Sequence, residues 1–186
     1  MVQTVRDAAE PREQAVLISG VYGSGKSAVA AEIAHLLEER RLPYAAMDLD
    51  WLGWFYTGDG DPSEHAREYN LSGDEVRLAN VAAVVGNYRS AGVRYLVLAG
   101  ALGWRAELEG LQRAVSMPMR VVRLEVPLAE IERRLAPDPT AGRVGDLRVA
   151  REWIESERGV GLEDVTVDGD RPIREVALKI LHILIS

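Results

Sequence analysis

The sequence predicts an α/β fold in which five parallel strands form one sheet with helices on both of its faces. Short apolar runs of strand length alternate along the chain with longer segments of helical periodicity, which is the pattern of a parallel sheet. The first run leads into a glycine-rich loop and then into a helix, an order that recurs in open α/β sheets. The predicted strands are residues 15–19, 44–47, 93–99, 119–125 and 163–167.

Length and composition favour a single globular domain. The chain has 186 residues, of which 47% are hydrophobic and 27% charged, enough for a sizeable core. A net charge of −7 argues against nucleic acid as a partner, and zero cysteines exclude disulfides and thiolate metal sites. No apolar run is long enough to cross a membrane. We expect a cytoplasmic protein with a flexible N-terminal segment, residues 1–13, that is not a signal peptide, and one domain at 14–186.

The loop after the first strand carries the most specific motif in the chain. Residues 20–27 fill every fixed position of G-x-x-x-x-G-K-[ST], and the helix predicted at 27–40 follows directly. Lys26 is one of only two lysines, so its place in the motif is unlikely to be coincidence. In such loops the lysine reaches the β- and γ-phosphates and the Ser27 hydroxyl ligates magnesium. The residues expected to hold the phosphates are Gly20, Gly23, Ser24, Gly25, Lys26 and Ser27.

Two carboxylates follow the second predicted strand. Asp48 and Asp50 are two positions apart, so on an extended segment they would point to the same side. They lie at the carboxyl end of the strand, where open α/β sheets bind ligands. A solvated turn, or the N-cap of a short helix, is the structural alternative.

An aromatic cluster comes next, from Trp51 to Tyr56, and includes Trp54. A plain core cluster is one interpretation, and a wall for a planar or sugar-like substrate is the other. The helix predicted at 72–90 then begins with a capping box and has a buried stripe. That stripe is Leu78, Val81, Val85 and Tyr88, while Arg77, Asn80 and Asn87 share an adjacent polar face. This polar face is either solvated or turned toward a substrate.

The third strand ends in Ala99, where many proteins with this loop carry an aspartate that supports magnesium. Asp48 is the nearest replacement. Helices are predicted at 105–115 and 127–135, and Arg134 ends the second of them. The segment that follows, about 136–146, has two prolines, two glycines and no periodicity. It is either a short mobile lid that brings Arg143 over the phosphates or an ordinary surface loop.

The C-terminal part is predicted to contain a helix at 147–158, the fifth strand, a loop at 168–172 and a helix at 173–185. The final turns of the last helix are apolar nearly all round, which suggests deep burial or a homodimer contact.

Taken in this order, the residues resemble the P-loop small-molecule kinases of the adenylyl-sulfate kinase, gluconate kinase and chloramphenicol phosphotransferase type. Asp48-Leu49-Asp50 stands where adenylyl-sulfate kinases have Asp-Gly-Asp, and Arg77-Leu78-Ala79-Asn80 resembles their Arg-x-x-Asn helix. Pro127-Leu128, followed by Arg134, is similar to the start of their lid region. The resemblance implies a P-loop NTPase fold like that of nucleoside-monophosphate kinases, with a short lid.

It also implies ATP-dependent transfer of the γ-phosphoryl group to a hydroxyl of a small molecule, with Mg²⁺. The expected catalytic residues are Asp50, Lys26, Arg143 and Arg134, with Ser27 and Asp48 at the metal. The expected acceptor residues are Asp48, Asp50, Trp54, Arg77, Asn80 and Arg105. The base of ATP is expected beside Asp170, Arg171 and Pro172. Adenylyl-sulfate kinase proper, an antibiotic-inactivating phosphotransferase, and a nucleotide-binding switch or ATPase without an acceptor remain the alternatives.

Overall fold

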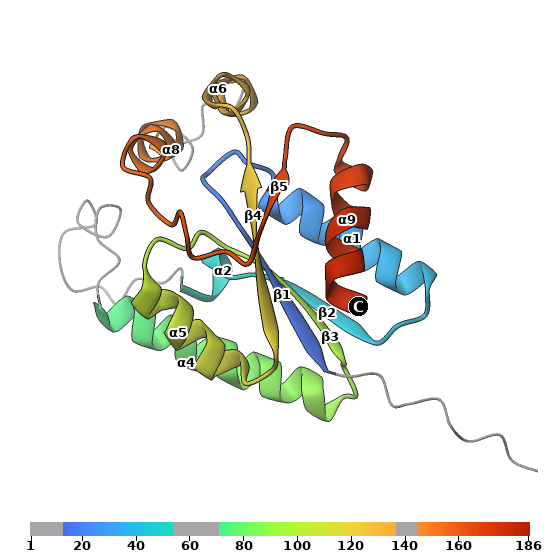
Figure 1. Cartoon of the computed structure of the whole chain (residues 1–186). Helices are drawn as coiled ribbons and strands as arrows, with labels where there is room; N and C mark the ends of the chain where they lie inside the picture. Colours follow the sequence, from blue (N-terminus) through green and yellow to red (C-terminus); the bar gives the residue numbers. More distant parts are fainter. Residues whose placement is uncertain (1–12, 54–70, 137–144) are drawn as a thin grey trace, which may run out of the picture.

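The computed structural model describes residues 13–53, 71–136 and 145–186, and within them it contains the predicted parallel sheet. Its five strands lie in the order β2-β3-β1-β4-β5, and every pairing is parallel (Figure 1). The strands are β1 (Gln14–Ser19), β2 (Tyr44–Asp48), β3 (Tyr95–Ala99), β4 (Met119–Glu125) and β5 (Val165–Asp168). The predicted fold class, a P-loop NTPase fold, is confirmed.

Strand register brings the carboxyl ends of the three strands nearest the site to one edge. Asp48 of β2 pairs with Ala99 of β3, and Ala99 pairs with Ile18 of β1. Because all strands are parallel, whatever follows β1, β2 and β3 emerges at the same edge. The glycine-rich loop and the two aspartates therefore begin side by side, although more than twenty residues separate them in the sequence.

Helices cover both faces of the sheet (Figure 1). On one face lie α1 (Lys26–Glu39) and α9 (Ile173–Ile185), which pack with the sheet into a core that includes Ile33, Leu37 and Ile180. On the other lie α4 (Leu71–Ser90) and α5 (Arg105–Val115), with a second core. The helices α6 (Leu128–Leu135) and α8 (Asp146–Glu155) pack against each other beyond the carboxyl edge of the sheet, and α2 (Asp50–Gly53) is a single short turn.

A third, small cluster joins α6 and α8 to the glycine-rich loop. Ile131, Leu135 and Ala150 are buried in it, and Val21 and Tyr22 of the loop pack against them. Apolar contacts thus anchor the pair of helices to the loop.

Several predicted details of the fold are wrong. The helix predicted at 147–158 spans Asp146–Glu155. β5 begins at Val165 rather than residue 163, because the Asp164 carboxylate itself accepts the Val121 N–H at 2.8 Å. The third strand begins at Tyr95 rather than residue 93, because the N–H of Val93 still closes the end of α4 on the Tyr88 carbonyl. Tyr88, predicted to be buried, is exposed.

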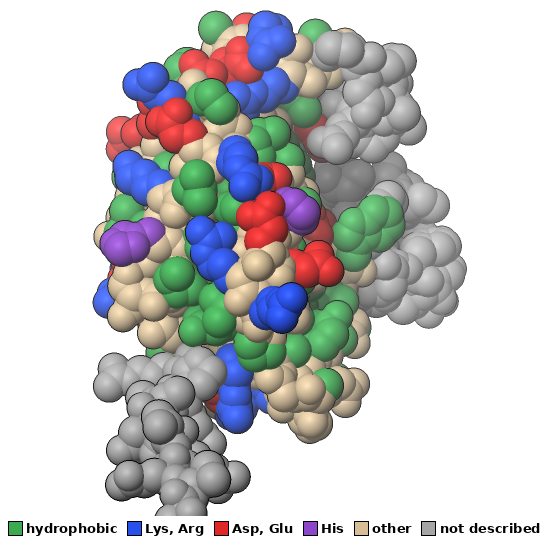
Figure 2. Space-filling model, turned by 90° about the vertical axis from the view of Figure 1, so that its right-hand side faces the viewer, with side chains coloured by type: hydrophobic (Ala, Val, Ile, Leu, Met, Phe, Trp, Pro, Cys, Tyr) green, Lys and Arg blue, Asp and Glu red, His purple; other side chains and the backbone are tan. Residues whose placement is uncertain are grey.

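The apolar final turns of the last helix suggested deep burial, but the helix is buried on one side only. Ile180 and Leu184 are fully buried, but Leu178 and Ile185 are 42% and 39% exposed. The face that carries α1 and α9 mixes basic, acidic and isolated apolar side chains (Figure 2). On it, Arg174 of α9 forms an ion pair with Glu32 of α1 at 2.7 Å. None of the described helices is both long and apolar enough to cross a membrane.

We expect Ile180→Ala to lower the free energy of unfolding by about 2–5 kcal/mol, because it removes a fully buried side chain and leaves a cavity. Leu178→Ala, two positions away on the exposed side of the same helix, is the matched control and should cost less than about 1 kcal/mol. Urea denaturation of both variants measures the difference. Equal losses would contradict the placement of α9.

Candidate active site

The glycine-rich loop wraps tightly between β1 and α1. Gly20 and Gly23 have φ angles of 147° and 79°, which side-chain-bearing residues rarely adopt. A methyl group at Gly20 would lie 2.8 Å from the Ser24 hydroxyl oxygen, and one at Gly23 would lie 3.0 Å from Leu135. Since α1 begins at Lys26, the N–H groups of its first turn border this loop and favour an anion there.

Lys26 is buried, with only 7% of its surface exposed. Its ammonium group donates a hydrogen bond to the Val21 carbonyl oxygen at 3.0 Å, and it lies 5.4 Å from the centre of the Tyr22 ring. The positive charge is therefore held inside the turn of the loop rather than in solvent. Electrostatically, the loop is prepared for a phosphate group.

Asp48 connects the start of α1 to the start of α2. One of its carboxylate oxygens accepts a hydrogen bond from the Ser27 hydroxyl at 2.5 Å. The other accepts the backbone N–H of Asp50 at 3.0 Å. The prediction that Asp48 and Asp50 share one extended segment is wrong, because Asp50 is the first residue of α2. Asp48 instead caps that short helix, as the structural alternative proposed.

Asp50 lies among several charges, and burial is the main influence on its carboxyl group. Burial raises the pKa of Asp50; Lys26 and Arg77 lower it, while Asp48 and Asp146 raise it, and the net pKa is above its ordinary value. A carboxyl group of this kind takes up a proton more readily than an exposed one. Asp146, the first residue of α8, was not identified from the sequence, because an aspartate at the start of a helix is common in any protein.

Arg77 and Asn80 hold α2 against α4. Arg77 forms an ion pair with Asp74 at 2.8 Å, and its alkyl chain packs on Gly53, where a methyl group would lie 3.0 Å away. The Asn80 amide donates a hydrogen bond to the Leu52 carbonyl oxygen at 2.8 Å. Both residues thus fix the helix that begins with Asp50, and their predicted contact with an acceptor stays a prediction.

The connection after β3 has no carboxylate at the strand end. The Ala99 carbonyl accepts the Leu49 N–H at 2.8 Å, and the Leu49 side chain fills the space beside Gly100. Arg105, at the start of α5, donates to the Gly161 carbonyl oxygen at 3.3 Å. Asp48 is therefore the carboxylate that contacts Ser27.

Arg134 bridges the glycine-rich loop and the β5–α9 connection. It donates to the Ser24 and Gly169 carbonyl oxygens, both at 3.2 Å, and lies 3.5 Å from the Asp170 carboxylate. On the helix it pairs with Glu130, whose pKa falls to about 2 because Arg133 and Arg134 both donate to it.

A cavity of about 220 Å³ lies beside this bridge. Its lining includes the apolar residues Val29, Ile173 and Val176. The other lining residues are Ser24, Glu130, Arg133, Arg134, Gly169 and Arg171. Arg171 is thus at the cavity, and Asp170 and Pro172 flank it in the sequence.

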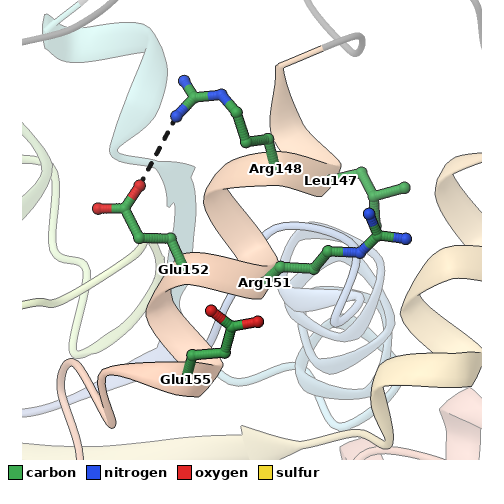
Figure 3. Close-up of a pocket in the computed structure, with 5 residues that line it drawn as sticks. All are labelled: Leu147, Arg148, Arg151, Glu152 and Glu155. Carbon is green, nitrogen blue, oxygen red and sulfur yellow. Dashed lines mark ion pairs between the residues drawn. The ribbon is translucent and has the colours of Figure 1, made fainter.

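A larger cavity, of about 430 Å³, runs along α8 and is lined by Leu147, Arg148, Arg151, Glu152 and Glu155 (Figure 3). Its charges are largely paired: Arg148 lies 3.6 Å from Glu152, and Arg151 lies 2.6 Å from Glu132. None of the residues predicted for the site lines it. We therefore place the candidate site at the glycine-rich loop.

Trp54, Arg143 and most of the predicted lid lie outside the described residues.

No family model and no curated protein sequence matches the chain. Solved structures do. A sugar kinase from Janibacter sp. HTCC2649 matches with a TM-score of 0.63 and 19% identity, over 92% of this chain and 94% of that one. The APS kinase CysC of Mycobacterium tuberculosis, in complex with AMPPNP and APS, matches with a TM-score of 0.60 and 22% identity, over 93% and 98%. The tunicamycin resistance protein of Deinococcus radiodurans matches with a TM-score of 0.59 and 19% identity, over 92% and 95%.

At these identities the likeness shows the fold alone: this chain has the fold of P-loop small-molecule kinases.

We expect Asp50→Asn to raise the free energy of unfolding at pH 7. The pKa of Asp50 is higher in the folded protein than in the unfolded chain, so between these two values the folded protein binds more protons and stability falls as the pH rises. Asparagine removes that cost. Urea denaturation across this range should show the advantage of the variant shrinking as the pH falls toward 3.8. A variant less stable than wild type at pH 7 would contradict the raised pKa.

Proposed function

We propose that the chain, as one kinase domain over residues 14–186, transfers the γ-phosphoryl group of ATP to a hydroxyl of a small molecule. The observation that carries the proposal is Asp50, a half-buried carboxyl group with a raised pKa that interacts with the charge of Lys26 in the phosphate-binding loop. A switch or a simple ATPase has no need of a proton acceptor in this place. The fold, shared with small-molecule kinases, supports the same conclusion.

The nucleotide would bind along the loop. The triphosphate accepts hydrogen bonds from the N–H groups of the loop and of the first turn of α1. Lys26 exchanges its contact with the Val21 carbonyl oxygen for the β- and γ-phosphates. The base occupies the cavity beside Gly169 and Arg171, where Val29 and Val176 offer an apolar surface.

The Ser27 and Asp48 oxygens fit a magnesium ion that arrives with the nucleotide. They are already 2.5 Å apart, and within the described ranges no three acidic or histidine side chains gather into a metal-binding group. That suits magnesium, which proteins usually hold through one or two side-chain oxygens together with phosphates and water. When bound, the ion would neutralise negative charge on the phosphates.

Asp50 would act on the acceptor. Its carboxylate accepts the proton of the acceptor hydroxyl as the acceptor oxygen forms a bond to the γ-phosphorus. The bond between that phosphorus and the oxygen bridging to the β-phosphate breaks, and ADP leaves. Burial favours this role, because a raised pKa makes the carboxylate a stronger base.

Arg134 would stabilise the nucleotide, since its guanidinium already joins the loop to the β5–α9 connection. We assign Arg143 and the lid at about 136–146 the corresponding role over the phosphates. Arg77, Asn80 and Arg105 would contact the acceptor, and Arg77 and Asn80 also position α2.

The first test is ADP formation with a panel of hydroxyl-bearing acceptors. Lys26→Ala should abolish acceptor-dependent ADP formation, because it removes the charge that faces the phosphates. Lys179→Ala is the matched control: it deletes the only other lysine, which is exposed on α9, and should leave the rate unchanged. A fully active Lys26→Ala enzyme would refute the phosphate assignment.

The second test separates the base from the nucleotide site. Asp50→Asn should lower turnover by roughly 10²–10⁴-fold, the range for a lost general base. ATP affinity, measured by calorimetry, should change less than about threefold, because Asp50 acts on the acceptor. If ATP affinity fell while turnover at saturating ATP stayed normal, Asp50 would belong to the metal site instead.

A further inference from the structure

Two large apolar side chains remain exposed at the edge of the sheet that carries Asp50. Trp51 follows Asp50 directly and is 70% exposed, and Trp104 ends the β3–α5 connection and is 59% exposed. Tryptophan is usually well buried, so two exposed tryptophans that follow neighbouring strands are unusual. Register pairs the ends of those two strands, Asp48 with Ala99.

Trp104 is held in place by a cation. The guanidinium carbon of Arg158 lies 4.9 Å from the centre of the Trp104 ring and 5.2 Å from that of Trp153. Arg158 therefore contacts the rings of two tryptophans, one on the β3–α5 connection and one on α8. It also lies 3.5 Å from the Glu152 carboxylate.

The backbone around Trp104 is closely packed and hydrogen-bonded. A methyl group at Gly159 would overlap the Leu102 carbonyl oxygen, and one at Gly103 would lie 3.2 Å from both Arg158 and Trp153. The Glu107 carboxylate accepts the N–H groups of Gly103 and Trp104, at 2.7 and 3.0 Å. The segment after α8 is thus packed directly on the β3–α5 connection.

We propose that Trp104 is the stacking surface for the phosphoryl acceptor, that Arg158 positions it, and that the acceptor carries a flat, uncharged ring besides its hydroxyl group. This inference rests on the proposed kinase function and names its substrate class. A flat ring covers an exposed indole well and gains from ring stacking. An indole already in contact with Arg158 loses less entropy when a ring binds it than an indole without contacts.

The charge of Arg158 disfavours a ligand whose ring is cationic or bears an ammonium group. A cation is attracted to the face of an indole, but here a guanidinium already occupies one face of Trp104. A second cation on the opposite face would be repelled by the charge of Arg158 across the ring. The surface therefore selects neutral rings over ammonium-bearing ones.

The test follows the indole N–H signals of ¹⁵N-labelled full-length protein by NMR, assigned through single Trp→Phe variants. Three probes are compared at equal concentration: 2-phenylethanol, 2-phenylethylamine and 2-cyclohexylethanol. We expect the Trp104 signal to move at least about threefold further with 2-phenylethanol than with the cationic or the non-planar probe. No Trp104 response, or equal responses to all three, would overturn the proposal.

Arg158→Met tests the role of the charge, because it keeps an apolar stem and removes the cation. Discrimination against 2-phenylethylamine should fall at least about threefold, and Arg158→Lys, which keeps the positive charge, should preserve it. Arg148→Met, which removes an exposed arginine from α8, is the control and should behave as wild type. If Arg158→Met does not fold, as signal dispersion will show, loss of discrimination in Arg158→Lys would still overturn the electrostatic part.

The binding experiment needs no nucleotide, so its failure can be told from failure of the kinase assignment. A selective Trp104 response in a protein that forms no ADP with any acceptor overturns the phosphoryl transfer but not the ring-binding surface. With an active acceptor, Trp104→Ala should raise its KM at least about tenfold without changing the KM for ATP, and Trp104→Phe should restore it. Unchanged acceptor KM in Trp104→Ala would overturn the stacking role.

Discussion

The candidate site depends on one hydrogen bond, from the Ser27 hydroxyl to the Asp48 carboxylate. Ser27 belongs to the first turn of α1, and Asp48 is the last residue of β2. Through its other oxygen, Asp48 also holds the N–H of Asp50 and so starts α2. A single carboxylate therefore connects the phosphate-binding loop to the short helix that begins with Asp50. Because β3 ends in Ala99, no neighbouring carboxylate on that strand duplicates this connection.

The fold could be predicted from the sequence because its signals are local. Strand-length apolar runs and the helical stripe of α1 depend on residues close in the chain, and the predicted bounds of β4, α5 and α9 match the structure. The errors arise where a distant residue intervenes. The Asp164 side chain takes the N–H of Val121, which shortens β5. No periodicity of residues 163–167 could reveal that competition.

The same division applies to the candidate site. The phosphate-binding loop is a contiguous motif, so its residues could be named in advance. The conformation at Asp50 could not be predicted, because the same residues are compatible with an extended strand end and with a helix capped by Asp48. The contributions of Asp146 and Arg158 were missed for another reason. Each acts across the fold, on Asp50 and on Trp104, and neither has a local pattern that distinguishes it from a surface charge.

The close approach of Gly23 to α6 has an evolutionary consequence. A carbon atom added at Gly23 would lie 3.0 Å from Leu135 and 3.2 Å from Ile131, closer than ordinary contacts, so the loop and the side chains of α6 fit tightly together. Substitutions at Ile131 and Leu135 are therefore expected to affect the shape of the phosphate-binding loop, although both side chains are apolar. Among natural descendants of this chain, positions 131 and 135 should change in compensating pairs that conserve their combined volume.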